Sequence, residues 1–329
     1  MFRSILVPLD GSPASEQALP AAVALCRRTA ARLHVVHVRA MGGTAGTPPT
    51  WAARLSNGER VYLDSVCSRI SDELGESVSF AVIPPQEPWL LGPTISAEAI
   101  AVRIAAYAES NGIELIVMST HARAALGRAW FGSVTEALLR STDTPMLLVR
   151  PVEGAHPPAW SLKPGRLHLL VPLDGSAGAE QVLEPALALG EAVDARYTLL
   201  RVIGLPSPAF DAMGPVMQPF GPEQIAAIHT DAQTELARSA ESLRARGADV
   251  SLVTLVNPSP AAAILGFARE NAIDAITLAT HARHGLARLF LGSVGDAVVR
   301  NAHCPVLLTR RVGAAAVVEP APGLEIARA

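Results

Sequence analysis

A seven-residue segment occurs twice in this chain, and this repeat constrains the fold more than any other feature. The sequence LVPLDGS at residues 6–12 returns unchanged at residues 170–176, which is an offset of 164. The later segments THAR (120–123) and GSV (132–134) both return at an offset of 160. Self-similarity at such a long period indicates that one folding unit of roughly 150 residues is written twice.

The repeat divides the chain into four parts. We expect a first domain over residues 1–150 and a second, related domain over residues 166–311. The segment 151–165 carries the proline and glycine residues of a linker. Residues 312–329 are rich in Ala, Pro and Gly, and we expect them to form a flexible tail.

Each copy alternates short apolar runs with helical patterns, which is typical of βαβ units and a parallel sheet. The expected strands are residues 4–9, 33–38, 78–83, 114–119 and 146–149, and then 168–173, 197–202, 250–256, 275–279 and 306–309. In the first copy we expect helices after Ser12-Pro13, near 58–74 and 96–110, and after Gly132. The pattern predicts an α/β fold with two doubly wound five-stranded parallel-sheet domains in tandem, which bind ligands beyond the carboxyl ends of the strands.

The composition excludes several classes of protein. Hydrophobic residues make up 50% of the chain and aromatic residues only 4%, so the cores must be built from Ala, Val, Leu and Ile. The 27 basic and 30 acidic side chains argue against a general nucleic-acid binder. Neither a membrane span of ~18 apolar residues nor a signal peptide is recognisable, so we expect no membrane association and a cytoplasmic location. Three scattered cysteines predict neither a metal site nor a disulfide framework.

The repeated motifs resemble those of the universal stress protein family (UspA type), with two such domains in tandem. The family's first mark, a V-P-x-D-x-S turn after the first strand, is present at residues 7–12 and 171–176. Its second mark is a G-x2-G-x9-G-[ST] loop after the fourth strand. That spacing is kept in both copies, but the first two glycines are replaced by Ser119 and Ala122, and by Ala279 and Ala282.

The resemblance implies an adenine nucleotide alpha hydrolase-like (HUP) fold and adenine nucleotide binding, with ATP, with or without Mg²⁺, as the ligand. The implied contacts of the first copy are Leu9, Asp10, Val38, Ser119, Ala122, Arg123, Gly132, Ser133 and Val134. Those of the second copy are Leu173, Asp174, Val202, Ala279, Ala282, Arg283, Gly292, Ser293 and Val294. The resemblance also implies that the last strand mediates dimerisation. We therefore expect the two domains to pair through it inside one chain and allow a further homodimer.

The residues themselves leave two interpretations open at each end of this site. A Gly-Ser pair at a helix start presents unpaired N–H groups to a phosphate, but Ser133 and Ser293 also fit helix-capping patterns. Asp10 and Asp174 can bind a ribose, or they can only close their own Asp-Gly-Ser turns. Ala and Ser in place of glycine fit if only a small side chain is required, and the Ser119 hydroxyl would then add a donor. They are strained if the position needs a positive φ.

The function expected from these observations is a non-enzymatic, ATP-binding regulatory protein of the stress response. The marks of P-loop NTPases, Rossmann dehydrogenases and α/β-hydrolases do not occur. One alternative is a protein-interaction module of the same fold without nucleotide. A slow ATPase is a further alternative, although no recognisable catalytic set supports hydrolysis.

Overall fold

The computed structural model of the protein describes residues 2–38, 57–83, 96–120, 132–150, 166–204, 210–211, 214–215, 221–280 and 292–310. The strands are β1 (Ser4–Leu9), β2 (Arg32–Val38), β3 (Val78–Ile83), β4 (Leu115–Ser119), β5 (Met146–Val149), β6 (Leu167–Pro172), β7 (Ala195–Ile203), β8 (Phe210–Asp211), β9 (Gly214–Pro215), β10 (Asp249–Val256), β11 (Ala275–Thr280) and β12 (Val306–Arg310). The ten strands expected from the sequence are confirmed to within two residues at each end. The short pair β8 and β9 was not expected.

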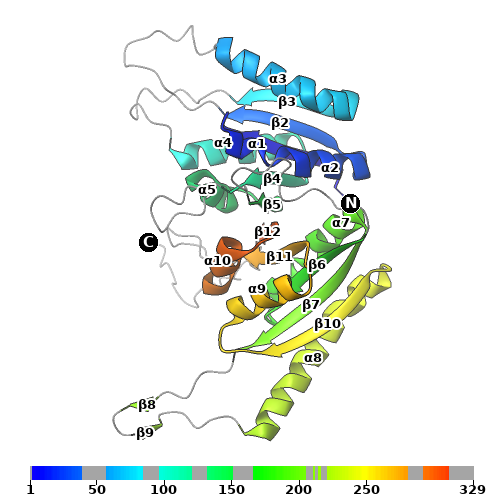
Figure 1. The fold of residues 1–329 in the computed structure, drawn as a ribbon, viewed down its shortest axis with the longest axis vertical. Helices are drawn as coiled ribbons and strands as arrows, with labels where there is room; N and C mark the ends of the chain where they lie inside the picture. The colour runs from blue at the N-terminus through cyan, green and yellow to red at the C-terminus, as the bar shows by residue number, and fades with distance from the viewer. Residues whose placement is uncertain are drawn as a thin grey trace, which may run out of the picture.

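Helices connect the strands in the same order in both copies (Figure 1). The first copy has α1 (Pro13–Glu16), α2 (Leu19–Thr29), α3 (Asn57–Leu74), the 3-10 turn η2 (Gly75–Ser77), α4 (Ala97–Ser110) and α5 (Ser133–Ser141). The second has α6 (Ala177–Glu180), α7 (Leu183–Val193), α8 (Pro222–Ala245), α9 (Pro260–Glu270) and α10 (Gly292–Asn301). No helix among the described residues has the length and apolar character needed to cross a membrane.

The first helix of each copy is interrupted after one turn, which differs from the single helix expected after Ser12-Pro13. As expected, the Ser12 side chain caps α1, and Pro13 opens it. The helix then restarts as α2, with Pro20 in its first turn. Proline has no N–H and disfavours a helical residue before it. The second copy breaks at the equivalent place between α6 and α7.

The described strands form a ten-stranded sheet in the order β10-β7-β6-β11-β12-β5-β4-β1-β2-β3. Within each half the strands are parallel and follow the doubly wound order, with the switch point between the first and fourth strands. The halves meet where β12 pairs antiparallel with β5, with Leu307 opposite Leu147. Figure 1 shows the two halves end to end, with α3 and α8 at the far ends.

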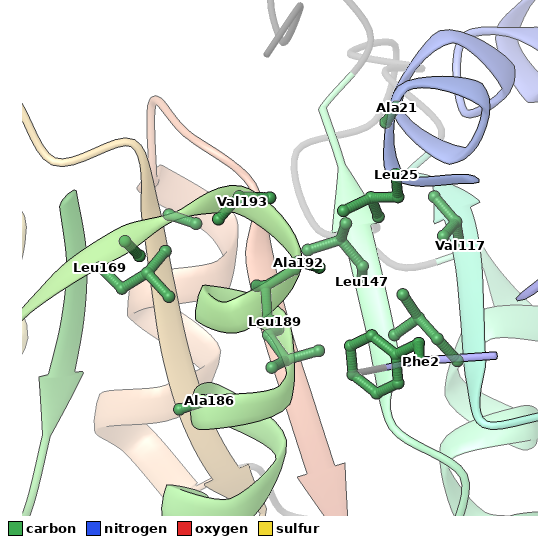
Figure 2. Packing of buried hydrophobic residues seen from close by; sticks show 14 of the residues in the cluster. Phe2, Ala21, Leu25, Val117, Leu147, Leu169, Ala186, Leu189, Ala192 and Val193 are labelled. Carbon is green, nitrogen blue, oxygen red and sulfur yellow. The ribbon is translucent and has the colours of Figure 1, made fainter. Parts of the chain in front are cut away.

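Both faces of the sheet are covered by helices, and strand side chains alternate between two apolar clusters. One cluster packs β-strand residues such as Ile5 and Val7 under α2, α3, α7 and α8. The other packs Leu6 and its equivalents under α4, α5, α9 and α10. The first cluster runs across the join: Figure 2 shows Leu25 of α2 and Leu189 of α7 on either side of Leu147. Because helices cover both faces of the sheet, the strands are apolar on both faces, and this accounts for the low share of charged residues in the chain.

Candidate functional site

A cavity of about 320 Å³ lies in the second half, at the carboxyl ends of β6, β7 and β11. It is lined by Pro172, Leu173, Asp174, Ala179, Leu200, Val202, Pro260, Ile264, Leu278, Ala279, Gly292, Ser293, Val294 and Gly295. The strand ends supply its floor, α9 supplies one wall, and the first turn of α10 supplies another. This is the switch point between β6 and β11, where open α/β sheets bind their ligands.

The cavity brings together most of the site residues expected for the second copy. These are Leu173, Asp174, Val202, Ala279, Gly292, Ser293 and Val294. Sequence reasoning missed the other half of the lining: Pro172, Ala179, Leu200, Pro260, Ile264, Leu278 and Gly295. Most of these are apolar residues of strands and helices, where a residue that faces a cavity and one that faces the core have the same pattern in the sequence.

The Asp-Gly-Ser turns that follow β1 and β6 have the same geometry in both copies. The Ser12 N–H donates to Asp10 Oδ1 over 2.9 Å, and the Ser176 N–H donates to Asp174 Oδ1 over 3.0 Å. The serine hydroxyls donate to the same oxygens. One oxygen of each carboxylate, Oδ1, therefore closes its own turn, which is one of the two roles that the sequence allowed for these aspartates. Both aspartates are exposed at the edge of the sheet.

Different side chains support the two turns from the face of the sheet opposite to the cavity. In the second copy, Arg201 Nη1 donates to the Leu173 carbonyl over 3.4 Å, and Arg201 Nη2 lies 3.9 Å from Glu235 Oε2. In the first copy, His37 packs edge-on against Tyr62, with ring centroids 5.9 Å apart. Burial raises the pKa of the Tyr62 phenol, and the nearby Glu16 carboxylate raises it further. The two turns therefore have the same backbone geometry but different neighbouring side chains: Arg201 and Glu235 in the second copy, His37 and Tyr62 in the first.

The helix starts bear on the capping role considered for Ser133, whereas its contact with a phosphate stays a prediction. The N-cap of α5 is Gly132, and Ser133 is the first helical residue, so Ser133 is not the cap. Gly292 opens α10 with φ +72°, a value that favours glycine, and Ser293 follows it as an exposed residue. The N–H groups of both first turns therefore point out of the helix end, as anion sites require.

One expected donor is committed elsewhere. The buried Ser119 hydroxyl donates to the Ala14 carbonyl of α1. This bond fixes α1 to the end of β4, so a contact of this hydroxyl with a phosphate would have to replace it and stays a prediction. Its equivalent, Ala279, has no hydroxyl and lines the cavity.

Several expected residues lie outside what the structure describes. Ala122 and Arg123 fall in residues 121–131, and Ala282 and Arg283 fall in residues 281–291. The linker at 151–165 and the tail at 312–329 are also outside the described residues. The remaining expected contacts of the first copy take equivalent places to the cavity residues: Leu9 ends β1 and Asp10 follows it, Val38 ends β2, and Val134 is in the first turn of α5.

The polar groups of the described site are few. Asp174 and Ser293 are the lining residues with polar side chains. Within the described ranges, no group of three or more His, Cys, Asp or Glu side chains is placed to hold a metal ion. The chemistry of this lining fits an apolar planar group beside a carboxylate and a helix N-terminus. It offers no preformed cage for Mg²⁺, which prefers oxygen ligands.

The sequence of this chain is similar to those of known universal stress proteins over most of its length. A universal stress protein of Mycobacterium tuberculosis is 28% identical over 211 residues, which cover 61% of this chain and 63% of that protein, just under two thirds of its length. Another from the same species is 24% identical over 323 residues, covering 93% of this chain and 94% of that protein.

A solved structure shows the same fold. It is a universal stress protein from Archaeoglobus fulgidus, 18% identical, which covers 94% of this chain and 96% of its own, with a TM-score of 0.62. The sequence profile of the universal stress protein family matches residues 1–68, 95–150 and 166–310. The chain therefore belongs to the universal stress protein family.

Proposed function

We propose that this protein is a non-enzymatic regulatory protein of the stress response that binds an adenine nucleotide, ATP, at the carboxyl edge of its sheet. The observation that carries the proposal is the cavity at the β6–β11 switch point. It gathers the turn after β6, the end of β7, the end of β11 and the start of α10 around one space. Its volume of about 320 Å³ is at the lower end of the range for small-molecule sites.

Each part of the lining suits one part of a nucleotide. Leu200, Val202 and Leu278 form an apolar wall for a base. Asp174 lies at the strand edge, where a carboxylate can accept hydrogen bonds from ribose hydroxyls. Gly292 and Ser293 open α10, whose N–H groups and dipole favour phosphate.

The proposal includes no chemical step. Phosphoryl transfer depends on positioned cations and a base or a water-orienting residue, and the lining offers one carboxylate and one hydroxyl. Instead, nucleotide occupancy would change the surface that the strand-end loops offer to partners. Pairing of the halves in solution, a further homodimer and a cytoplasmic location remain predictions.

The test is direct. Purified protein is denatured and the supernatant is analysed for released nucleotide, and the stripped protein is then titrated with ATP by calorimetry. We expect adenine nucleotide in the first assay or heat of binding in the second. If no nucleotide is released and no heat is measured at millimolar ATP, the nucleotide-binding proposal fails and the function is that of a protein-interaction module. Magnesium-dependent phosphate release above a blank would instead support the slow ATPase.

A variant locates the binding event in the cavity. Gly292→Asp places a side chain and a negative charge where the phosphate is expected, so ATP binding to this site should be lost. Gly292 has φ +72°, so the variant is also strained. Gly247→Asp is the matched control because Gly247 has φ +82° and a Cβ there meets nothing within 4 Å. Equal ATP binding by both variants would show that the cavity is not the site.

A further inference from the structure

At three equivalent positions of the proposed nucleotide site, the first half has a larger side chain than the second. Three lining residues of the second-half cavity are Ala179, Ala279 and Gly295. Their repeat equivalents in the first half are Ser15, Ser119 and Thr135, respectively. At each position the first half has the larger side chain, and each of these carries a hydroxyl. The difference lies in the lining itself, not in the surrounding sheet, which has the same order in both halves.

We propose that the two sites are unequal: the second-half cavity is the principal nucleotide site, and Ser15, Ser119 and Thr135 narrow the first-half site so that it binds more weakly. The inference rests on the proposed function. It identifies Thr135 and Gly295 as the residues that set the depth of each site.

Thr135 carries the largest part of the difference. Gly295 lines the cavity from the first turn of α10. Thr135 occupies the same place in the first turn of α5 and is only 2% exposed, so its methyl and hydroxyl fill space inside the half instead of projecting into solvent. Packed protein interiors accommodate added atoms poorly. A ligand in the first half must therefore stop short of the depth that Gly295 allows in the second.

The two serines close the floor of the first-half site. The Ser119 hydroxyl donates to the Ala14 carbonyl, and the Ser15 hydroxyl donates to the Ser12 carbonyl over 2.8 Å. The first bond holds α1 against the end of β4, and the second lies within the first turn of α1 and its N-cap. In the second half, Ala179 and Ala279 present methyl groups at the corresponding places. The second-half floor is therefore wider and more apolar, which suits a base.

The helix that forms the wall of the site is also longer in the first half than in the second. In the second half α9 begins at Pro260, which lines the cavity. In the first half α4 has 14 residues against 11 in α9, and the extra turn is at its N-terminal end, towards the mouth of the site. Glu98 in this turn lies 3.4 Å from Arg140 of α5. The α4 wall therefore extends further and is tied to the helix that carries Thr135.

The experiment exchanges the two depth-setting residues. The stripped full-length protein is titrated with ATP by calorimetry, and the wild type should show one tight event and one event at least about tenfold weaker. Gly295→Thr should weaken the tight event about tenfold or more, because the added side chain enters the cavity. Thr135→Gly should strengthen the weak event by a similar factor. Thr135→Ala gives the same direction with a good helix former if the glycine variant is unstable.

Gly266→Thr is the matched control for Gly295→Thr. Gly266 lies in α9, outside the cavity, and a Cβ there meets nothing within 4 Å. This variant should bind ATP like the wild type, and thermal unfolding of all unliganded variants checks the fold. Two wild-type events of equal affinity, or a Gly295→Thr protein that binds like Gly266→Thr, would overturn the inequality but leave the proposed function standing. Absence of any wild-type binding would overturn the proposed function itself.

Discussion

At the scale of single residues, the two copies solve the same packing problem with different pairs. In the second copy Gly190 of α7 packs on Tyr197 of β7, whose buried hydroxyl donates to the Leu187 carbonyl over 3.4 Å. The equivalent pair in the first copy is Cys26 and Leu33, both buried. A smaller residue on the helix is thus matched by a larger one on the strand. Burial raises the pKa of Tyr197 to about 12, so the phenol stays neutral.

We predict that Gly190→Ala lowers the free energy of unfolding by about 1–3 kcal/mol. The reason is steric, since a Cβ at Gly190 would lie 1.8 Å from the Tyr197 hydroxyl oxygen. Urea denaturation measures the change. The double variant Gly190→Cys/Tyr197→Leu recreates the first-copy pair and should be more stable than its two single changes predict when added. Strict additivity would contradict a direct contact.

Two histidines, the buried His34 and the partly buried His168, predict how stability depends on pH. Burial lowers the pKa of His34, and Arg32 lowers it further. Burial likewise lowers the pKa of His168, with Arg196 acting in the same direction. Both imidazoles therefore take up a proton less readily in the folded protein than in the unfolded chain, where a histidine is protonated below pH ~6.5. The free energy of unfolding should fall as the pH falls through that value.

The measurement is the urea midpoint between about pH 7 and pH 5. The His34→Gln/His168→Gln variant removes both groups and should show a shallower decline than the wild type. An unchanged slope in this variant would show that other groups cause the decline.

At the scale of elements, each half anchors a helix of the other with an arginine from the end of its last strand. Arg150, after β5, donates from Nη1 to the Ala302 carbonyl at the end of α10 over 3.3 Å. Arg310, at the end of β12, donates from Nη1 to the Arg140 carbonyl of α5 over 3.1 Å and lies 3.4 Å from Asp143. A cation at a helix C-terminus also interacts favourably with the helix dipole.

Removing either anchor should weaken the protein by a similar amount. We expect Arg150→Gln and Arg310→Gln each to lower the free energy of unfolding by about 1 kcal/mol, the usual net contribution of such a hydrogen bond. Chemical denaturation gives the values. Arg3→Gln is the control, because the Arg3 side chain is 87% exposed beside Glu114 and should change stability by less than about 0.5 kcal/mol. A loss no larger than that of Arg3→Gln would contradict the anchoring role.

At the scale of the whole molecule, the two halves form one sheet with a shared core. The antiparallel β5–β12 pairing makes the sheet continuous. One apolar cluster contains Leu147 and Leu307 together with residues of α2 and α7 (Figure 2). Arg28 Nη1 also donates to the Val193 carbonyl across the join, over 3.0 Å. The covalent linker is therefore one of several connections between the halves.

We predict that the halves stay together when the linker is cut. The test is to introduce a protease site into residues 151–165 and to cleave the protein there under native conditions. Size-exclusion chromatography or native mass spectrometry should then find one particle of the full mass, which separates into two fragments only in denaturant. Two separate particles under native conditions would contradict the shared core, and the uncut protein carrying the same insertion is the control.

The sequence alone determined the repeat and the ten main strands, and it predicted a site at the strand ends. These features depend on local patterns: apolar runs, the Asp-Gly-Ser turn and the Gly-Ser helix start are all short in sequence. The family resemblance added a ligand class and the expected contact residues, seven of which line the cavity. The break between α1 and α2 could also have been found, because Pro20 marks it.

Only the tertiary structure decided which residues share the cavity and how the copies differ. Ile264 and Leu278 have the pattern of core residues, and only packing shows that they border a space. The Ser119 hydroxyl finds its acceptor on Ala14, more than a hundred positions away in the chain, so no local pattern could reveal that bond. The sequence difference between Thr135 and Gly295 likewise bears on the depth of the two sites only because the structure places Gly295 in the cavity wall. Contacts between segments distant in sequence depend on the packed fold, and that is the physical limit of reasoning from the chain alone.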